Sequence, residues 1–106
     1  MTVIEVSRHN GVPCGIKASG HSGYAEAGSD VVCSAVSVLL QTLELGLSDV
    51  LGLQPEAYVD TEAARIELRW NGGGEPARVL AESIFRALQE TARSYGSFVK
   101  YVEVSL

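Results

Sequence analysis

Alternating hydrophobic and polar residues open the chain and predict two β-strands joined by a tight turn. In residues 2–8, apolar side chains alternate with polar ones, as in a strand with one solvated face. Asn10-Gly11 follows, the strongest short sequence signal for a two-residue hairpin loop. The return strand, about residues 12–19, would place small or apolar side chains on one face: Cys14, Ile16 and Ala18. The chain is therefore predicted to begin with a β-hairpin.

A long apolar stripe at helical spacing predicts a helix from about Asp30 to Ser48. The stripe is formed by Val32, Val36, Leu39, Leu43 and Leu47. Gly46 and Gly52 mark where this helix weakens and ends. Three further apolar residues lie on its other faces and predict burial on more than one side: Val31, Val38 and Leu45.

The second half of the chain repeats the order of two strands and a helix. Strands are predicted at residues 57–60 and 64–70, joined as a hairpin near residues 60–62, and the alternation in the second strand places Trp70 in the core. After a turn at residues 71–74, Pro76 suits the first position of a helix, and Gly96 suits the cap beyond its end. A last strand is predicted at residues 98–104.

The element order is thus ββ-α-ββ-α-β, which indicates an α+β domain. Hairpins in place of βα repeats favour a mostly antiparallel sheet, with a mixed sheet as the alternative, and with the two helices packed on one face. At 106 residues, the chain is expected to form a single domain over residues 1–106.

Composition narrows the functional classes. The formal net charge is −5, which argues against a nucleic-acid partner and favours a basic protein partner. We expect no signal peptide and no membrane-spanning segment, and hence a cytoplasmic protein in which Cys14 and Cys33 stay reduced. The apolar content of 46% suggests that a second copy covers some surface, as in a homodimer.

Residues 20–33 contain the candidate catalytic residues, because a glycine-rich loop in this segment includes a histidine and leads to a cysteine. Ser29 stands where a helix N-cap is expected, and Cys33 would then lie in the first helical turn. A thiolate at that place is stabilised by the helix dipole, which would lower the pKa of Cys33. His21 is the nearest base. The pattern therefore predicts nucleophilic catalysis by Cys33 with His21 as base.

Other interpretations of these residues are a structural cysteine, a phosphate-binding loop and a metal site. A lone cysteine at a helix start is more often structural, and the glycine-rich loop matches no phosphate-binding motif. A metal site is not expected, because the spacing of Cys14, His21 and Cys33 fits no zinc pattern. Asp30 either complements the helix dipole or orients His21 as a third catalytic member. No cofactor is expected.

The segments Gly20-His21-Ser22-Gly23-Tyr24-Ala25 and Gly28-Ser29-Asp30-Val31-Val32-Cys33-Ser34-Ala35-Val36-Ser37 closely resemble the signature of the ribosomal-processing cysteine protease family, Prp. The resemblance is strong over residues 20–43, and the chain length and element order agree throughout. Ser34 departs from the small apolar residue expected after the nucleophile.

This resemblance implies a cytosolic, homodimeric endopeptidase that removes an N-terminal extension from large-subunit ribosomal protein twenty-seven. The family's catalytic histidine falls on His21 and its nucleophile on Cys33, with Asp30 and Ser37 as supporting residues. The family's flexible substrate loop corresponds to positions just before His21 and between His21 and Cys33: Gly20, Ser22, Gly23, Tyr24 and Gly28. Two alternatives remain open: a non-catalytic ribosome-assembly or peptide-binding module, and a different thiol enzyme such as a small acyl transferase or redox protein.

Overall fold

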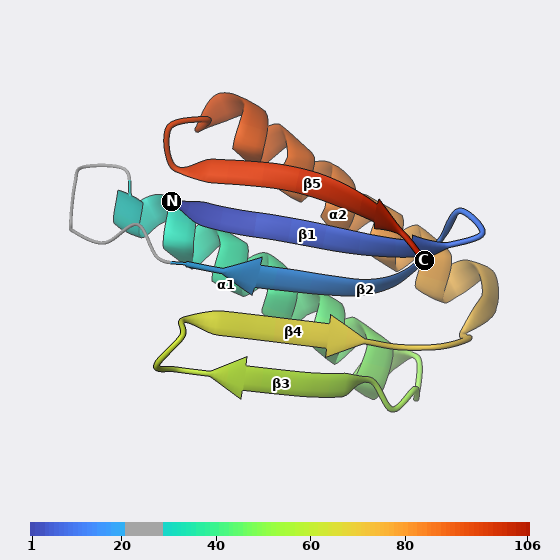
Figure 1. Ribbon diagram of the computed structural model, residues 1–106. Coiled ribbons are helices and arrows are strands. Elements are labelled where there is room, and N and C mark those ends of the chain that lie inside the picture. Colours follow the sequence, from blue (N-terminus) through green and yellow to red (C-terminus); the bar gives the residue numbers. More distant parts are fainter. Residues whose placement is uncertain (21–28) are drawn as a thin grey trace.

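The computed structural model describes residues 1–20 and 29–106, without the side chains of residues 29–31. Its elements are β1 (Thr2–His9), β2 (Val12–Ser19), α1 (Ser29–Leu45), β3 (Glu56–Asp60), β4 (Arg65–Arg69), α2 (Gly74–Ser94) and β5 (Val99–Ser105). A π-helical turn, η1 (Gly46–Val50), directly continues α1. The strands form one five-stranded sheet, and both helices cover the same face of it (Figure 1). The predicted α+β class and element order are confirmed.

The sheet is mixed, with the strand order β3-β4-β2-β1-β5. Strand β1 pairs antiparallel with β2, and β4 pairs antiparallel with both β2 and β3. Strand β5 instead lies parallel to β1. The reason is visible in Figure 1: α2 carries the chain back to the end of the sheet at which β1 begins, so that β5 runs in the same direction. Strand β3 is left as an edge strand.

The first hairpin forms as predicted, but it contains a bulge that the alternation did not reveal. Asn10 and Gly11 both have positive φ, at 51° and 79°, as a two-residue hairpin loop requires. The pairing register shifts after Ser7, which leaves Cys14 without a partner on β1. Cys14 is half-buried, and its thiol donates to the carbonyl oxygen of Ser7 at 3.5 Å. The prediction that Cys14 shares the buried face with Ile16 is therefore wrong.

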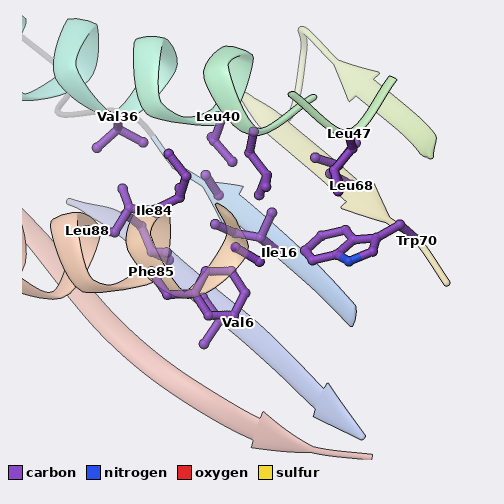
Figure 2. Close-up of a cluster of buried hydrophobic side chains, with 14 of the residues drawn as sticks. Val6, Ile16, Val36, Leu40, Leu47, Leu68, Trp70, Ile84, Phe85 and Leu88 are labelled. Atoms are coloured by element: carbon purple, nitrogen blue, oxygen red, sulfur yellow. The ribbon is translucent and has the colours of Figure 1, made fainter. Parts of the chain in front are cut away.

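The hydrophobic core lies between the sheet and the two helices (Figure 2). Leu43 of α1 and Leu88 of α2 are completely buried, and each such side chain contributes roughly 1.5–3 kcal/mol by leaving water. Trp70, just after β4, is 6% exposed and meets Phe85 of α2 with ring centroids 6.5 Å apart. The predicted core position of Trp70 is confirmed.

The outer face of α1 is more exposed than the sequence indicated. Val38 and Leu45 are 58% and 53% exposed, so the predicted burial on a second side is wrong for both, and the Val31 side chain is outside the described residues. The helices form a single layer on the sheet, and α1 therefore has an inner face and an outer face. By length and composition alone, Val32–Val50 could also cross a membrane, contrary to expectation. Core helices meet the same criterion, and the inner face of this one lies in the core.

The glycines near the helix ends behave differently from one another. Helix α1 passes into η1 at Gly46, and Gly52 takes a left-handed conformation, so the predicted weakening and end of this helix are confirmed. Helix α2 begins at Gly74, two residues before Pro76, and ends with the Tyr95 amide donating to the Thr91 carbonyl oxygen. Gly96 does not adopt positive φ, so it is not the left-handed cap that was predicted.

Candidate active site

Cys33 is the fifth residue of α1, because the helix already includes Ser29. Ser29 is therefore already helical and is not the predicted N-cap. Cys33 lies about one residue beyond the first turn, in which it was predicted. The backbone N–H groups that lack an intrahelical partner belong to residues before Cys33. Since the helix dipole acts mainly within the first turn, its stabilisation of a Cys33 thiolate is weaker than a first-turn position would give.

Cys33 is half-buried and lines a cavity of about 330 Å³ between α1 and the strands β2 to β4. The wall is mainly apolar and includes Val36, Leu40 and Ile66. Polar residues also line it: Thr2, Ser37, Asp60, Thr61 and Arg65. A thiol beside a concave apolar surface with several polar groups is an arrangement typical of a binding or catalytic site.

Gly20, the last described residue before His21, lines the same cavity. Its φ of 82° is in the left-handed region, and its N–H donates to the carbonyl oxygen of Ala64 at 3.1 Å. A Cβ at this position would lie 2.5 Å from the carbonyl oxygen of Met1. Glycine is therefore required by both the backbone conformation and the available space, and it fixes the end of β2 at the cavity.

The remaining predicted site residues are divided between the described and the undescribed parts of the chain. Ser37, one helical turn after Cys33, is half-buried and lines the cavity. The side chain of Asp30 lies outside the described residues. So do His21 and four of the predicted loop residues: Ser22, Gly23, Tyr24 and Gly28. Of the predicted residues, the structure thus brings together Gly20, Cys33 and Ser37.

The hairpin of β3 and β4 supplies a wall of the cavity that sequence analysis did not foresee. Asp60 accepts a hydrogen bond from the Ala63 amide at 3.0 Å, and Ala64 has a positive φ of 49°. The Arg65 guanidinium lies over the Tyr58 ring at 5.5 Å, and its Nε is buried without an acceptor among the described residues. No motif marks these residues, because their place beside Cys33 depends on β4 pairing with β2.

A second polar cluster lies apart from Cys33 and joins β1, α2 and β5. Arg8 donates to Glu82 at 2.8 Å and to Glu103 at 3.2 Å, and its guanidinium stacks over Phe85 at 5.4 Å. The hydrogen bond from Arg8 lowers the pKa of Glu82. Burial, followed by the charge of nearby Glu103, raises the pKa of Tyr101 to about 12. These contacts fasten the helix layer to the sheet.

Side chains that could ligate a metal lie apart from one another in the described part of the chain. Cys14 and Cys33 are both thiols, not joined in a disulfide. Within residues 1–20 and 29–106, no three histidine, cysteine or acidic side chains gather closely enough to hold a metal ion.

Known structures share this fold over nearly the whole chain. SMU.848 from Streptococcus mutans is 22% identical, with a TM-score of 0.91, covering 100% of this chain and 96% of its own. The ribosomal processing protease Prp from S. aureus, in complex with a substrate peptide, is 16% identical, with a TM-score of 0.87, covering 98% and 100%. The same protease with a covalently linked product peptide is 17% identical, with a TM-score of 0.85 and the same coverage. No curated protein matches the sequence.

A thiol on a helix beside an open cavity is placed where its sulfur could act as a nucleophile on a bound substrate. The family model for the cysteine protease Prp matches residues 1–100. The chain therefore belongs to the cysteine protease Prp family, the ribosomal-processing proteases whose signature its residues 20–43 resemble.

Proposed function

We propose that this chain removes the N-terminal extension of large-subunit ribosomal protein twenty-seven, with Cys33 as nucleophile and His21 as general base and acid. The observation that carries the proposal is that Cys33 and Gly20, the residue directly before His21 in the sequence, line one cavity. Family membership supports a proteolytic role for that thiol. The formal charge of −5 also suits a basic ribosomal-protein substrate.

In the proposed mechanism, His21 takes the proton of the Cys33 thiol, and the sulfur attacks the scissile carbonyl carbon. The C–N bond breaks as His21 returns the proton to the leaving amine. Water then hydrolyses the thioester, releasing the carboxylic acid and restoring the thiol. The apolar wall of the 330 Å³ cavity would receive an apolar side chain beside the scissile bond.

The test is incubation of the purified protein with the extended ribosomal protein, followed by mass spectrometry. Wild type should remove the N-terminal segment, and both Cys33→Ala and His21→Ala should abolish the cleavage. Cys14→Ala is the matched control, because Cys14 is the other thiol and lies outside the cavity; it should cleave at the wild-type rate. If wild type binds the substrate but leaves it whole, the chain is instead a non-catalytic ribosome-assembly or peptide-binding module.

We also propose that the protein acts in the cytoplasm as a homodimer. Val38 and Leu45 expose apolar surface on the outer face of α1, which supports association with a second copy. Light scattering at micromolar concentration should give twice the 11.3 kDa chain mass. A measured mass equal to that of one chain would contradict the proposed homodimer.

A further inference from the structure

A second cavity extends the one that contains Cys33. It encloses about 310 Å³ and shares four lining residues with the first: Ser37, Leu40, Val59 and Ile66. The two cavities therefore form one continuous groove between α1 and the β3–β4 hairpin, which we call the α1–β3 groove. Its floor includes Val59 of β3, which is 62% exposed although it pairs with Ile66. Helix α1 therefore does not cover β3 at this position.

One face of α1 lines the groove along its length. Cys33, Ser37, Gln41 and Glu44 follow one another at three- or four-residue spacing, which places them on the same side of the helix. At 1.5 Å per residue, the path from Cys33 to Glu44 is about 16 Å. An extended peptide rises about 3.3 Å per residue, so the groove accommodates about five residues of a substrate.

Three polar side chains along this face, those of Ser37, Gln41 and Glu44, make no hydrogen bond or ion pair with the described residues. Three hydroxyls of the two helices, those of Thr42, Ser83 and Thr91, donate to the carbonyl oxygen four residues earlier, as Thr42 does to Val38 at 2.7 Å. Ser37 makes no such bond, and the Gln41 amide is likewise unpaired within residues 1–20 and 29–106. Both side chains are thus available to hydrogen-bond the backbone of an extended peptide.

The two acidic residues at the far end of the groove differ in whether they form an ion pair. Glu44 of α1 and Glu67 of β4 line it there. Glu67 is already paired with Arg69 at 2.7 Å. Glu44 is half-buried and has no ion pair in the described part of the chain. A basic side chain arriving at this end of the groove would therefore find an unpaired carboxylate on a partly apolar surface, where charge pairing is screened less than on an open surface.

We propose that the α1–β3 groove binds an extended stretch of the peptide substrate on one side of the scissile bond, and that Glu44 selects lysine or arginine four or five residues from that bond. This inference rests on the proposed peptidase function, which it deepens by naming a specificity-determining residue. Leu40, Val59 and Ile66 provide the apolar surface beneath the intervening residues. Ser37 and Gln41 hold the peptide backbone.

Charge reversal tests the proposal. Wild type, Glu44→Lys and Glu90→Lys are each incubated with a peptide library prepared from a bacterial proteome, and the cleaved peptides are aligned on the scissile bond by mass spectrometry. Wild type should favour lysine or arginine at the fourth or fifth position on one side, and Glu44→Lys should favour acidic residues there. Glu90→Lys, the matched control on α2, should keep the wild-type profile. A profile that Glu44→Lys leaves unchanged would overturn the inference while preserving the peptidase.

A binding measurement separates this inference from the proposed chemistry. The Cys33→Ala variant is titrated with two labelled octapeptides of alternating leucine and serine, one with lysine at both ends and one with glutamate at both ends. The lysine peptide should bind about fivefold more tightly, as expected for one half-buried ion pair. Adding Glu44→Lys should cancel or reverse that preference, and adding Glu90→Lys should not. Equal binding of the two peptides would contradict the role of Glu44, whether or not wild type cleaves any peptide.

Discussion

Replacing Gly20 by alanine tests how the end of β2 is fixed beside Cys33. The left-handed backbone at Gly20 costs alanine about 1 kcal/mol relative to glycine. The new Cβ would also lie 2.5 Å from the Met1 carbonyl oxygen and would displace the peptide that includes the Thr2 amide. That amide donates to the Phe98 carbonyl oxygen at 2.8 Å, a bond worth about 1 kcal/mol. We therefore expect Gly20→Ala to lower the free energy of unfolding by about 2 kcal/mol.

Gly11→Ala is the matched control, since Gly11 has nearly the same φ, but a Cβ added there would have no neighbouring atom within 4 Å. It should cost only the backbone term of about 1 kcal/mol. Urea unfolding at 25 °C measures both changes, with the same dependence on urea concentration for each variant. The catalytic efficiency of Gly20→Ala should also fall below that of Gly11→Ala, because Gly20 leads the chain into residue 21. Equal destabilisation by the two substitutions would refute the steric argument.

Three further predictions concern stability. Leu43→Ala should cost about 3 kcal/mol and Leu45→Ala less than about 0.5 kcal/mol in thermal unfolding, because Leu43 is fully buried and Leu45 is 53% exposed; similar losses would contradict the assigned helix faces. Ala64→Gly should raise the free energy of unfolding by about 1 kcal/mol by relieving positive φ, and a loss in urea unfolding would be evidence against that strain. Arg8 lowers the pKa of Glu82 below 4.5, so this pair stabilises the fold above that pH and ceases to do so as pH falls through the lower, folded value. Because Glu82 is 41% exposed, Glu82→Gln should cost no more than about 1 kcal/mol at pH 7 and should reduce the acid sensitivity of unfolding, and an unaltered pH profile would exclude this role.

Local patterns in the sequence were sufficient for the elements of the fold. Asn10-Gly11 requires positive φ at two successive residues, which hairpin loops provide, and the alternation in β4 required one buried face. Both signals involve neighbours in sequence. The bulge at Cys14 leaves no such signal, because it arises from the register with β1.

Features that depend on how distant elements pack could not be predicted. The exposure of Val38 follows from the single helix layer, and the parallel pairing of β5 follows from the path of α2. The wall formed by Val59 and Arg65 reaches Cys33 because β4 pairs with β2, which no local pattern specifies. Sequence therefore identified the candidate nucleophile, and the structure was needed to identify the groove beside it.

Covalent trapping of the nucleophile tests the assignment of Cys33 most directly. The protein is treated at pH 6–7 with a peptide vinyl sulfone, and peptide mapping by mass spectrometry locates the adduct. We predict rapid modification of Cys33 alone, with Cys14 unmodified and the adduct absent from Cys33→Ala. Equal modification of both thiols, or reaction of Cys33 no faster than an ordinary free thiol, would contradict its role as the activated nucleophile.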